Sequence, residues 1–123
     1  MTKLTLTLAA LLLAACTDAQ TGATCPAVAP PTYEGFARPF VAKYCAECHA
    51  RTATHRHGAP AEDCFDTEAD LRAHAADIDA LAAKGPDATN TEMPDMSGPV
   101  RVAPSDAERT RLGQFLACEA RMP

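Results

Sequence analysis

The chain contains two cysteines separated by only two residues, Cys45 and Cys48, and a histidine, His49, directly follows the second. Residues three apart lie on the same side of a helical turn, so both thiols can face one neighbouring group. Each thiol can add to a vinyl group of a porphyrin as a thioether, and the histidine is then placed to bind the iron. This spacing is the attachment pattern of a c-type haem. It predicts one covalent haem c with Cys45 and Cys48 as attachment points and His49 as an iron ligand.

A pair of cysteines at this spacing also occurs in redox dithiols and as half of a zinc site. A zinc site with four cysteines needs a second closely spaced pair, but Cys25, Cys64 and Cys118 lie far apart in the sequence. A thioredoxin-like site needs alternating strands and helices, and the sequence shows almost no strand pattern. Covalent haem is therefore favoured over a redox dithiol or a structural metal site.

The composition is that of a small acidic domain with a modest apolar core of its own. The chain has 123 residues with no Trp, two Tyr and four Phe, and it has 11 Lys and Arg against 16 Asp and Glu. A domain of this size gains stability from a cofactor or a covalent cross-link. No basic run is present, so no nucleic-acid partner is expected. Because alanine is abundant and favours helices, we expect an all-α fold.

The first 16 residues have the pattern of an export signal. Lys3 supplies a short positive region, and the apolar stretch 4–13 is too short for a permanent membrane span. The stretch leads into the letters LAAC, ending at Cys16, which resemble the lipobox of bacterial lipoprotein signal peptides. That resemblance implies cleavage before Cys16, a lipid anchor on its thiol and a location in the bacterial periplasm. An ordinary signal peptide with a coincidental cysteine is the alternative.

The residues after this signal predict the rest of the domain organisation. Thr17, in place of Asp, follows the cysteine, and by the usual lipoprotein sorting pattern this favours the outer membrane. Residues 17–31 are rich in Thr, Ala and Pro and lack amphipathic periodicity, which is typical of a flexible tether. We therefore expect a signal peptide at 1–15, a lipidated cysteine and tether at 16–31, and a haem domain at 32–123.

Three amphipathic segments predict helices in the haem domain. The first begins at Thr32 and contains Pro39, which should kink or restart it. The second covers residues 67–84, and the third begins at Ser105. Both open with a Ser or Thr followed three residues later by an acidic residue, the pattern of a capping box, at Thr67 with Asp70 and Ser105 with Glu108. The first helix carries an aromatic stripe that we expect in the core, namely Tyr33, Phe36, Phe40 and Tyr44.

Two further elements resemble the class I cytochromes c. In that family a proline shortly after the ligand histidine accepts a hydrogen bond from its second ring nitrogen, and Pro60, in a Gly-Ala-Pro sequence, lies eleven residues after His49. A later loop of the family presents a methionine, often followed by proline, to the other side of the iron. Met93 precedes a proline 44 residues after His49, with Met96 as the alternative ligand. The resemblance covers residues 33–122 and implies about three helices wrapped around one haem, with His49 and Met93 as axial ligands.

Three other histidines and one asparagine lie near these elements. His55 and His57 depart from the family pattern, and we expect them in a solvated loop, although either could approach a haem propionate or compete for the iron. His74 lies beside the apolar stripe of the second helix and is expected to be a half-buried structural residue. Asn90 lies three residues before Met93 and could donate a hydrogen bond to the ligand sulfur.

Three cysteines remain once Cys16 and the haem pair are set aside: Cys25, Cys64 and Cys118. One disulfide and one free thiol is the simplest arrangement. Cys118 lies near the end of the last helix and is expected to pair with either Cys25 or Cys64. A bond to Cys25 would join the N-terminal segment to the domain, whereas a bond to Cys64 would fix the loop after the haem motif.

Together these features predict a membrane-anchored electron carrier with a single haem, which exchanges electrons with redox partner proteins. The sequence contains no evident arrangement of catalytic acid, base or nucleophile, so we do not expect an enzyme that acts by itself. Two alternatives remain open. One is a haem enzyme or gas sensor with an open distal site, and the other is a haem-free lipoprotein that binds a metal or has a structural role.

Overall fold

The computed structural model describes residues 19–122, which are helical and contain no β-strand beyond one isolated bridge between Lys84 and Thr89. The predicted all-α class is therefore confirmed for these residues. None of the described helices is long and apolar enough to cross a membrane. The predicted signal peptide 1–15 and Cys16 lie outside the described residues. In chain order the helices are the π-helix η1 (Tyr33–Ala37), α1 (Arg38–Tyr44), α2 (Ala46–His49), α3 (Glu68–Ala73), α4 (Ala75–Ala82) and α5 (Asp106–Glu119).

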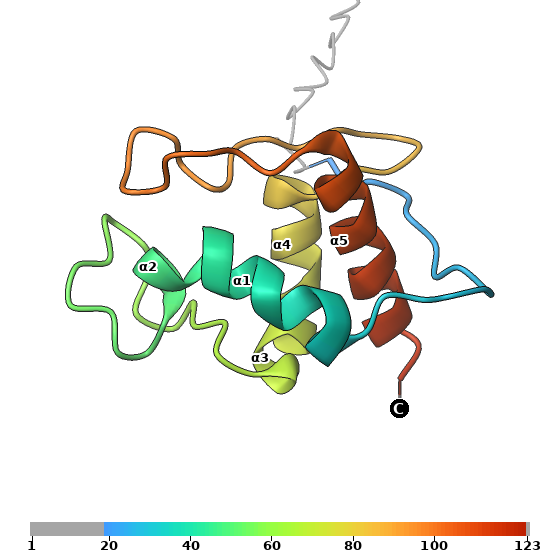
Figure 1. The fold of residues 1–123 in the computed structure, drawn as a ribbon, viewed down its shortest axis with the longest axis horizontal. Coiled ribbons are helices and arrows are strands. Elements are labelled where there is room, and N and C mark those ends of the chain that lie inside the picture. The colour runs from blue at the N-terminus through green and yellow to red at the C-terminus, as the bar shows by residue number, and fades with distance from the viewer. Residues whose placement is uncertain (1–18, 123) are drawn as a thin grey trace, which may run out of the picture.

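Helices α4 and α5 pack against each other, and α1 runs across the view of Figure 1 beside them. Side chains from all three predicted helical regions meet in one core, in which Leu71, Leu112 and Phe115 are almost fully buried. Burial of these side chains is the main source of stability in a domain with so few aromatic residues. The short α2 extends from the end of α1 and is followed by a long loop, residues 50–67, that leads to α3.

The first helical region begins and restarts where the sequence predicts. The Thr32 hydroxyl accepts a hydrogen bond from the Gly35 amide (3.1 Å) and caps η1. Pro39 lies in the first turn of α1, where its missing N–H is tolerated. The predicted restart at Pro39 is therefore confirmed, as a change from π-helix to α-helix. The aromatic stripe continues across this change, with ring centres 5.5 Å apart for Phe36 and Phe40 and 4.9 Å apart for Phe40 and Tyr44.

The helix predicted over residues 67–84 begins as expected but is divided in two and ends early. The capping box of Thr67 and Asp70 is present at the start of α3. His74 leaves helical geometry (φ −104°, ψ 14°) and separates α3 from α4, which ends at Ala82. Gly85 follows the end of α4 and lies directly against the Thr21 carbonyl, where a Cβ atom would have no room.

The last helix, α5, begins with the predicted capping box, which is confirmed. The Ser105 hydroxyl accepts from the Glu108 amide (3.2 Å), and the Glu108 carboxylate accepts from the Ser105 amide (2.8 Å). The same carboxylate accepts a hydrogen bond from the Tyr44 hydroxyl at 2.9 Å. The cap of α5 is thereby joined to the end of α1.

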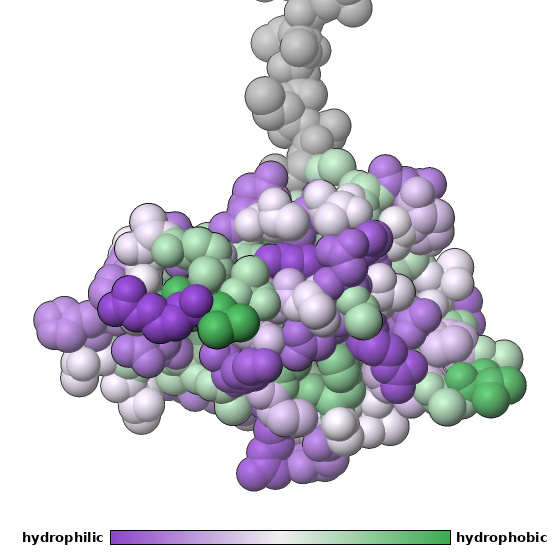
Figure 2. All heavy atoms as spheres, turned by 45° about the horizontal axis from the view of Figure 1, so that its top comes forward, coloured by the Kyte–Doolittle hydropathy of each residue, from purple (hydrophilic) through white to green (hydrophobic). Residues whose placement is uncertain are grey.

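The surface of the domain is mixed in character. On the face shown in Figure 2, hydrophobic side chains form small patches separated by hydrophilic ones. The large apolar side chains that are exposed among the described residues come from several different segments of the chain: Val28, Met93, Met96, Val102 and Met122. Scattered exposed apolar residues are common in soluble domains, so most of them carry no functional argument.

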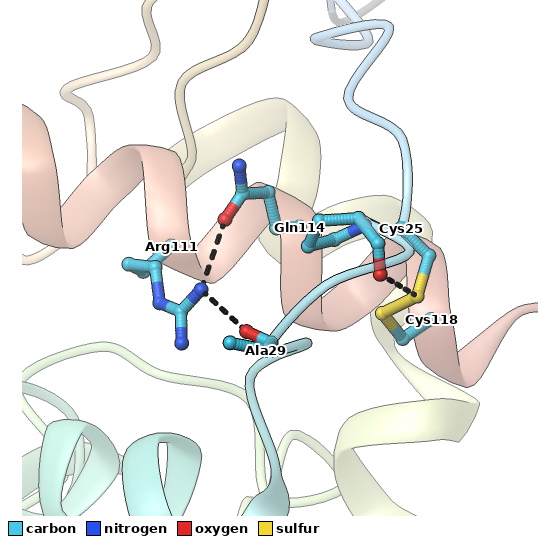
Figure 3. Close-up of a disulfide and its surroundings, with 6 residues drawn as sticks. Cys25, Ala29, Arg111, Gln114 and Cys118 are labelled. Carbon is cyan, nitrogen blue, oxygen red and sulfur yellow. Dashed lines mark hydrogen bonds between the residues drawn. A yellow bond between two sulfur atoms is a disulfide. The ribbon is translucent and has the colours of Figure 1, made fainter.

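The part of the predicted tether that the structure describes, residues 19–31, is joined to the helices at Thr21 and Cys25, whereas residues 27–30 are exposed. Thr21 is fully buried, and its amide and hydroxyl both donate to the Asp79 carboxylate at 2.7 Å. A disulfide joins Cys25 to Cys118 on α5 (Figure 3), which is one of the two predicted pairings. The composition of this segment is typical of a flexible tether. It gives no sign of these contacts, because their partners lie more than 50 positions away in the sequence.

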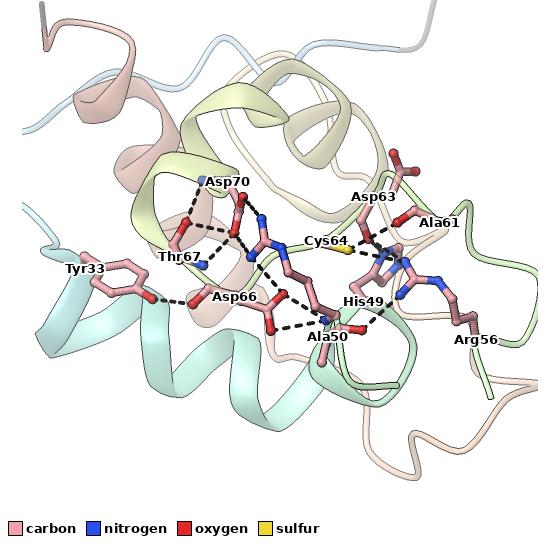
Figure 4. Close-up of polar contacts among 11 residues, drawn as sticks. Tyr33, His49, Ala50, Arg56, Ala61, Asp63, Cys64, Asp66, Thr67 and Asp70 are labelled. Carbon is pink, nitrogen blue, oxygen red and sulfur yellow. Dashed lines mark hydrogen bonds and ion pairs between the residues drawn. The ribbon is translucent and has the colours of Figure 1, made fainter. Parts of the chain in front are cut away.

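The cap of α3 makes one acid-sensitive contribution to stability. The Arg51 guanidinium and the Thr67 side chain and amide hold the pKa of Asp70 at about 2, below its ordinary value near 4 (Figure 4). A lowered pKa means that the unfolded chain takes up this proton first as the pH falls. The contribution, roughly 1–2 kcal/mol given the exposure of Arg51, should be complete above pH 4 and lost as the pH falls to about 2.

We therefore expect Asp70→Asn to lower the free energy of unfolding at pH 6 and to flatten its decline between pH 4 and pH 2. Urea unfolding at a series of pH values measures both effects. A variant whose unfolding free energy declines with acid as steeply as that of the unmodified protein would contradict this assignment.

Candidate functional site

An open, mainly apolar cavity lies between α1, α2, α4 and the loops that precede α3 and α5. Its volume is about 1230 Å³ with the open mouth included. Its apolar wall comes from all parts of the fold and includes Phe40, Val41, Phe65, Leu71, Ile78 and Leu112. Concave, mainly apolar surfaces are typical of sites for cofactors and other small molecules. The sequence motif at residues 45–49 and the loop that carries Met93 both line this cavity.

The residues Cys45, Cys48 and His49 form a single helical turn at the cavity wall. The Cys45 carbonyl accepts from the amides of Cys48 (3.2 Å) and His49 (2.9 Å), which fixes the turn. All three side chains line the cavity, and neither thiol is in a disulfide. The two thiols can therefore react with one group that occupies the cavity while the imidazole approaches the same group.

The environment of the two thiols disfavours their ionised form. Burial and the neighbouring Cys48 raise the pKa of Cys45 to about 12, and burial followed by the charge of Glu47 raises the pKa of Cys48. Redox dithiols and zinc-binding cysteines depend on a stabilised thiolate. A thioether carries no charge, so covalent attachment to an organic group is compatible with this buried setting.

A backbone carbonyl holds the imidazole of His49 in one orientation. The Nδ1 atom lies 2.8 Å from the Asp63 carbonyl oxygen, which can only accept, so Nδ1 carries the proton. The Nε2 atom then has a free lone pair, as a metal ligand requires. The ring of Phe65 stacks on His49 at 4.4 Å between centres. These contacts, shown in part in Figure 4, leave Nε2 as the atom available for binding.

The prediction that Pro60 accepts this hydrogen bond is wrong, because Nδ1 of His49 carries one hydrogen and donates it to the Asp63 carbonyl instead. The Arg56 guanidinium donates to the carbonyl oxygens of Ala50 (2.9 Å) and Asp63 (3.0 Å), as Figure 4 shows. It also donates to the carbonyl oxygen of Pro60 (2.7 Å). It thereby gathers the loop after His49 into a compact turn that presents Asp63 to the ring. A side-chain contact of this kind is not visible in a Gly-Ala-Pro sequence, and sequence reasoning missed Arg56, Asp63 and Phe65.

The structure distinguishes the two candidate methionines. Met93 lines the cavity and is 37% exposed, whereas Met96 does not line it and is 46% exposed. The Met93 amide donates to the Leu81 carbonyl (2.9 Å), and its carbonyl accepts from Arg109 (2.8 Å). Both backbone polar groups of Met93 are therefore fixed, which favours Met93 over Met96 as a side chain held at the cavity.

Asn90 has a structural role that differs from the predicted one. Its side-chain amide donates to the carbonyls of Ala19 (2.7 Å) and Asp79 (2.9 Å), so it joins the N-terminal segment to α4. Because both donor hydrogens are used in these bonds, the prediction that Asn90 donates to the methionine sulfur is wrong.

Of the remaining histidines, His57 and His74 line the cavity and His55 does not. The Nδ1 atom of His74 lies 3.8 Å from the Asp63 carboxylate, and its ring meets the edge of Phe65 with 5.5 Å between centres. His74 is therefore separated from His49 by an aromatic ring. It is partly exposed, which agrees with the predicted half-buried structural position.

The other predicted site residues lie apart from the cavity. Cys118 forms its disulfide with Cys25, and Cys64 is a buried free thiol that donates to the Ala61 carbonyl at 3.3 Å. Within residues 19–122, no three His, Cys, Asp or Glu side chains gather into a group that could hold a metal ion. A comparison of the chain with protein-family models, curated proteins and solved structures found no match.

Proposed function

We propose that this protein is a c-type cytochrome with a single haem, which carries electrons between redox proteins in the bacterial periplasm. The observation that carries the proposal is that Cys45, Cys48, His49 and Met93 all line one apolar cavity. The residues fit the group, because an apolar wall suits the porphyrin face and the cysteine pair and histidine share one turn. When bound, the haem supplies an iron that gains and loses one electron.

In this proposal each side chain at the cavity has a distinct role. Cys45 and Cys48 hold the porphyrin through thioethers, and His49 and Met93 are the axial ligands of the iron. The hydrogen bond from Nδ1 of His49 to Asp63 orients the ring and increases the basicity of Nε2. The methionine thioether raises the reduction potential relative to a second imidazole. The apolar wall excludes water from the ligands.

The packed N-terminal segment changes what a lipid anchor would do. If Cys16 carries the lipid, three residue steps lead to Ala19, whose carbonyl already accepts a hydrogen bond from Asn90. Three steps of extended chain span at most about 11 Å. The domain would then be held close to the membrane surface, and its redox partners would need to reach it there. The net charge of the full sequence is −5, and an acidic balance favours partners with basic docking surfaces.

The proposal is tested by producing the full chain in a bacterial periplasm together with the machinery that attaches haem c. The purified protein should be coloured, and its mass should exceed that of the mature polypeptide by one haem after denaturation. The reduced form should resist carbon monoxide, since both axial positions are filled. A colourless product without the added mass of a haem would support a haem-free lipoprotein, and rapid stoichiometric carbon monoxide binding would support an open distal site.

Substitution of the two methionines tests the ligand assignment. In Met93→Ala the haem should stay attached, the absorption band of a sulfur ligand on oxidised iron should disappear, and the reduced form should bind carbon monoxide rapidly. The matched control, Met96→Ala, removes a methionine that does not line the cavity and should leave both properties unchanged. The reverse pattern would transfer the ligand role to Met96.

A further inference from the structure

Arg109 on α5 is a buried cation whose guanidinium contacts the backbone of the loop that carries Met93. The side chain is only 3% exposed, and its Nη1 atom donates to the carbonyls of Ala82 (2.7 Å), Met93 (2.8 Å) and Asn90 (3.0 Å). Among the described residues no carboxylate lies within ion-pair distance of it. The positive charge is therefore compensated by three carbonyl dipoles.

A cation buried in this way is costly unless its hydrogen bonds are made. Burial also lowers the pKa of Arg109. Nη1 carries only two hydrogens, so the three carbonyl oxygens share them and are drawn to one point. These oxygens come from the end of α4 and from two positions in the loop that follows it. The guanidinium thus fixes the loop to both α4 and α5.

Both backbone polar groups of Met93 are restrained. Its carbonyl is held by Arg109, while its amide donates to the Leu81 carbonyl at 2.9 Å. With both backbone groups fixed, the position of its Cα atom is set by α4 and α5 together. Arg109 itself is fixed in the first turn of α5, where its amide donates to the Ser105 carbonyl at 2.9 Å.

We propose that Arg109 is a positioning residue for the Met93 ligand, because its guanidinium holds the Met93 carbonyl and so keeps the thioether at the cavity. This inference rests on the proposed function. Without the guanidinium the three carbonyls lose their donor and the loop can move into solvent. The Met93 sulfur then leaves its position part of the time, and the distal side of the iron becomes open to other ligands.

The test measures carbon monoxide binding to the reduced haem protein and the sulfur-ligand absorption band of the oxidised form. Arg109→Gln should bind carbon monoxide roughly tenfold faster or more, the factor expected for loss of at least one charge-assisted hydrogen bond. Arg109→Lys returns a cation but not the planar guanidinium, and its rate should lie severalfold above that of the unmodified protein. Both variants should keep their covalent haem.

Arg72→Gln is the matched control. It also removes a guanidinium that contacts α5, since Arg72 pairs with the buried Glu119 at 2.9 Å, but it lies away from the Met93 loop. Arg72→Gln should lower stability without changing carbon monoxide binding. If Arg109→Gln acted only by destabilising the whole domain, Arg72→Gln would raise the rate of carbon monoxide binding as well, and that result would overturn the inference.

A double-mutant cycle tests whether Arg109 acts through Met93. In the Met93→Ala background, Arg109→Gln should add no further increase in rate, because the ligand is already absent. The inference would be overturned by an additional tenfold increase in that background. It would also be overturned if the single variant Arg109→Gln bound carbon monoxide at the rate of the unmodified protein. Neither result would contradict the proposed function. If Arg109→Gln does not fold, Arg109→Lys decides by the same criterion. Rapid binding by the unmodified protein would overturn the proposed function as well.

Discussion

Replacing Cys45 and Cys48 together by alanine is expected to yield an exported protein without covalent haem, whose mass equals that of the mature polypeptide. The two thiols face the cavity from one turn, and no other described cysteine lines it. Without the cofactor the apolar wall of the cavity is left in contact with water. We expect stability to fall by more than about 3 kcal/mol, which for a domain of this size lowers the melting temperature by more than about 10 °C.

Cys64→Ala is the control for this double variant. It removes a buried free thiol that lies outside the cavity, so it should keep both the colour and the mass of the haem protein. Mass spectrometry after denaturation and circular dichroism of the melting transition measure the two expected effects. A double variant that retains covalently attached haem would contradict the assignment of Cys45 and Cys48.

The parts of the fold that sequence reasoning predicts well are those set by neighbours in the chain. The two capping boxes, the cap at Thr32 and the restart at Pro39 each depend on residues within four positions of one another. The turn at residues 45–49 is of the same kind. Local hydrogen bonds and the missing N–H of proline have the same effect in most tertiary surroundings. Their sequence patterns can therefore be recognised before the fold is known.

The contacts that sequence reasoning missed join distant segments. The partner of His49 is Asp63 rather than Pro60, in a loop whose carbonyls Arg56 joins, and residues 19–31 are held by contacts to Asp79 and Cys118. Such contacts leave no periodic pattern in the sequence around either of the two residues. Arg109 is an exception, because it lies on the same helical stripe as the buried Leu112 and Leu116. A charged residue on an apolar stripe is a signal of a buried polar contact.

Two arginines, Arg56 and Arg109, have the same role in different loops. Arg56 gathers the carbonyls of Ala50, Pro60 and Asp63 beside His49, and Arg109 gathers those of Ala82, Asn90 and Met93. Each loop lacks regular secondary structure, so its backbone carbonyls need donors from elsewhere. A guanidinium offers several donors in a rigid plane and can satisfy three carbonyls at once. In our proposal both axial ligands of the iron are thereby held by loops that an arginine fixes.

Removal of the disulfide in the double variant Cys25→Ala/Cys118→Ala is expected to lower the free energy of unfolding by about 3–5 kcal/mol. The bond closes a loop across 93 residues, and cross-links that close long loops restrict the unfolded chain most. The same bond holds residues 19–31 against α5, where Arg111 also donates to the Ala29 carbonyl at 3.2 Å (Figure 3). Without it, the segment would be held by hydrogen bonds only, among them those of the buried Thr21 to Asp79 and of Asn90 to the Ala19 carbonyl.

Urea unfolding of the double variant and of the unmodified protein measures this difference, with the midpoint expected at lower urea and the slope somewhat larger. Dithiothreitol should shift the midpoint of the unmodified protein toward that of the variant, because both then lack the same cross-link. Cys64→Ala is again the control, since its thiol is not in a disulfide and its midpoint should not respond to dithiothreitol beyond the response of the unmodified protein. Equal midpoints for the double variant and the unmodified protein would mean that the hydrogen bonds of residues 19–31 stabilise the segment without help from the cross-link.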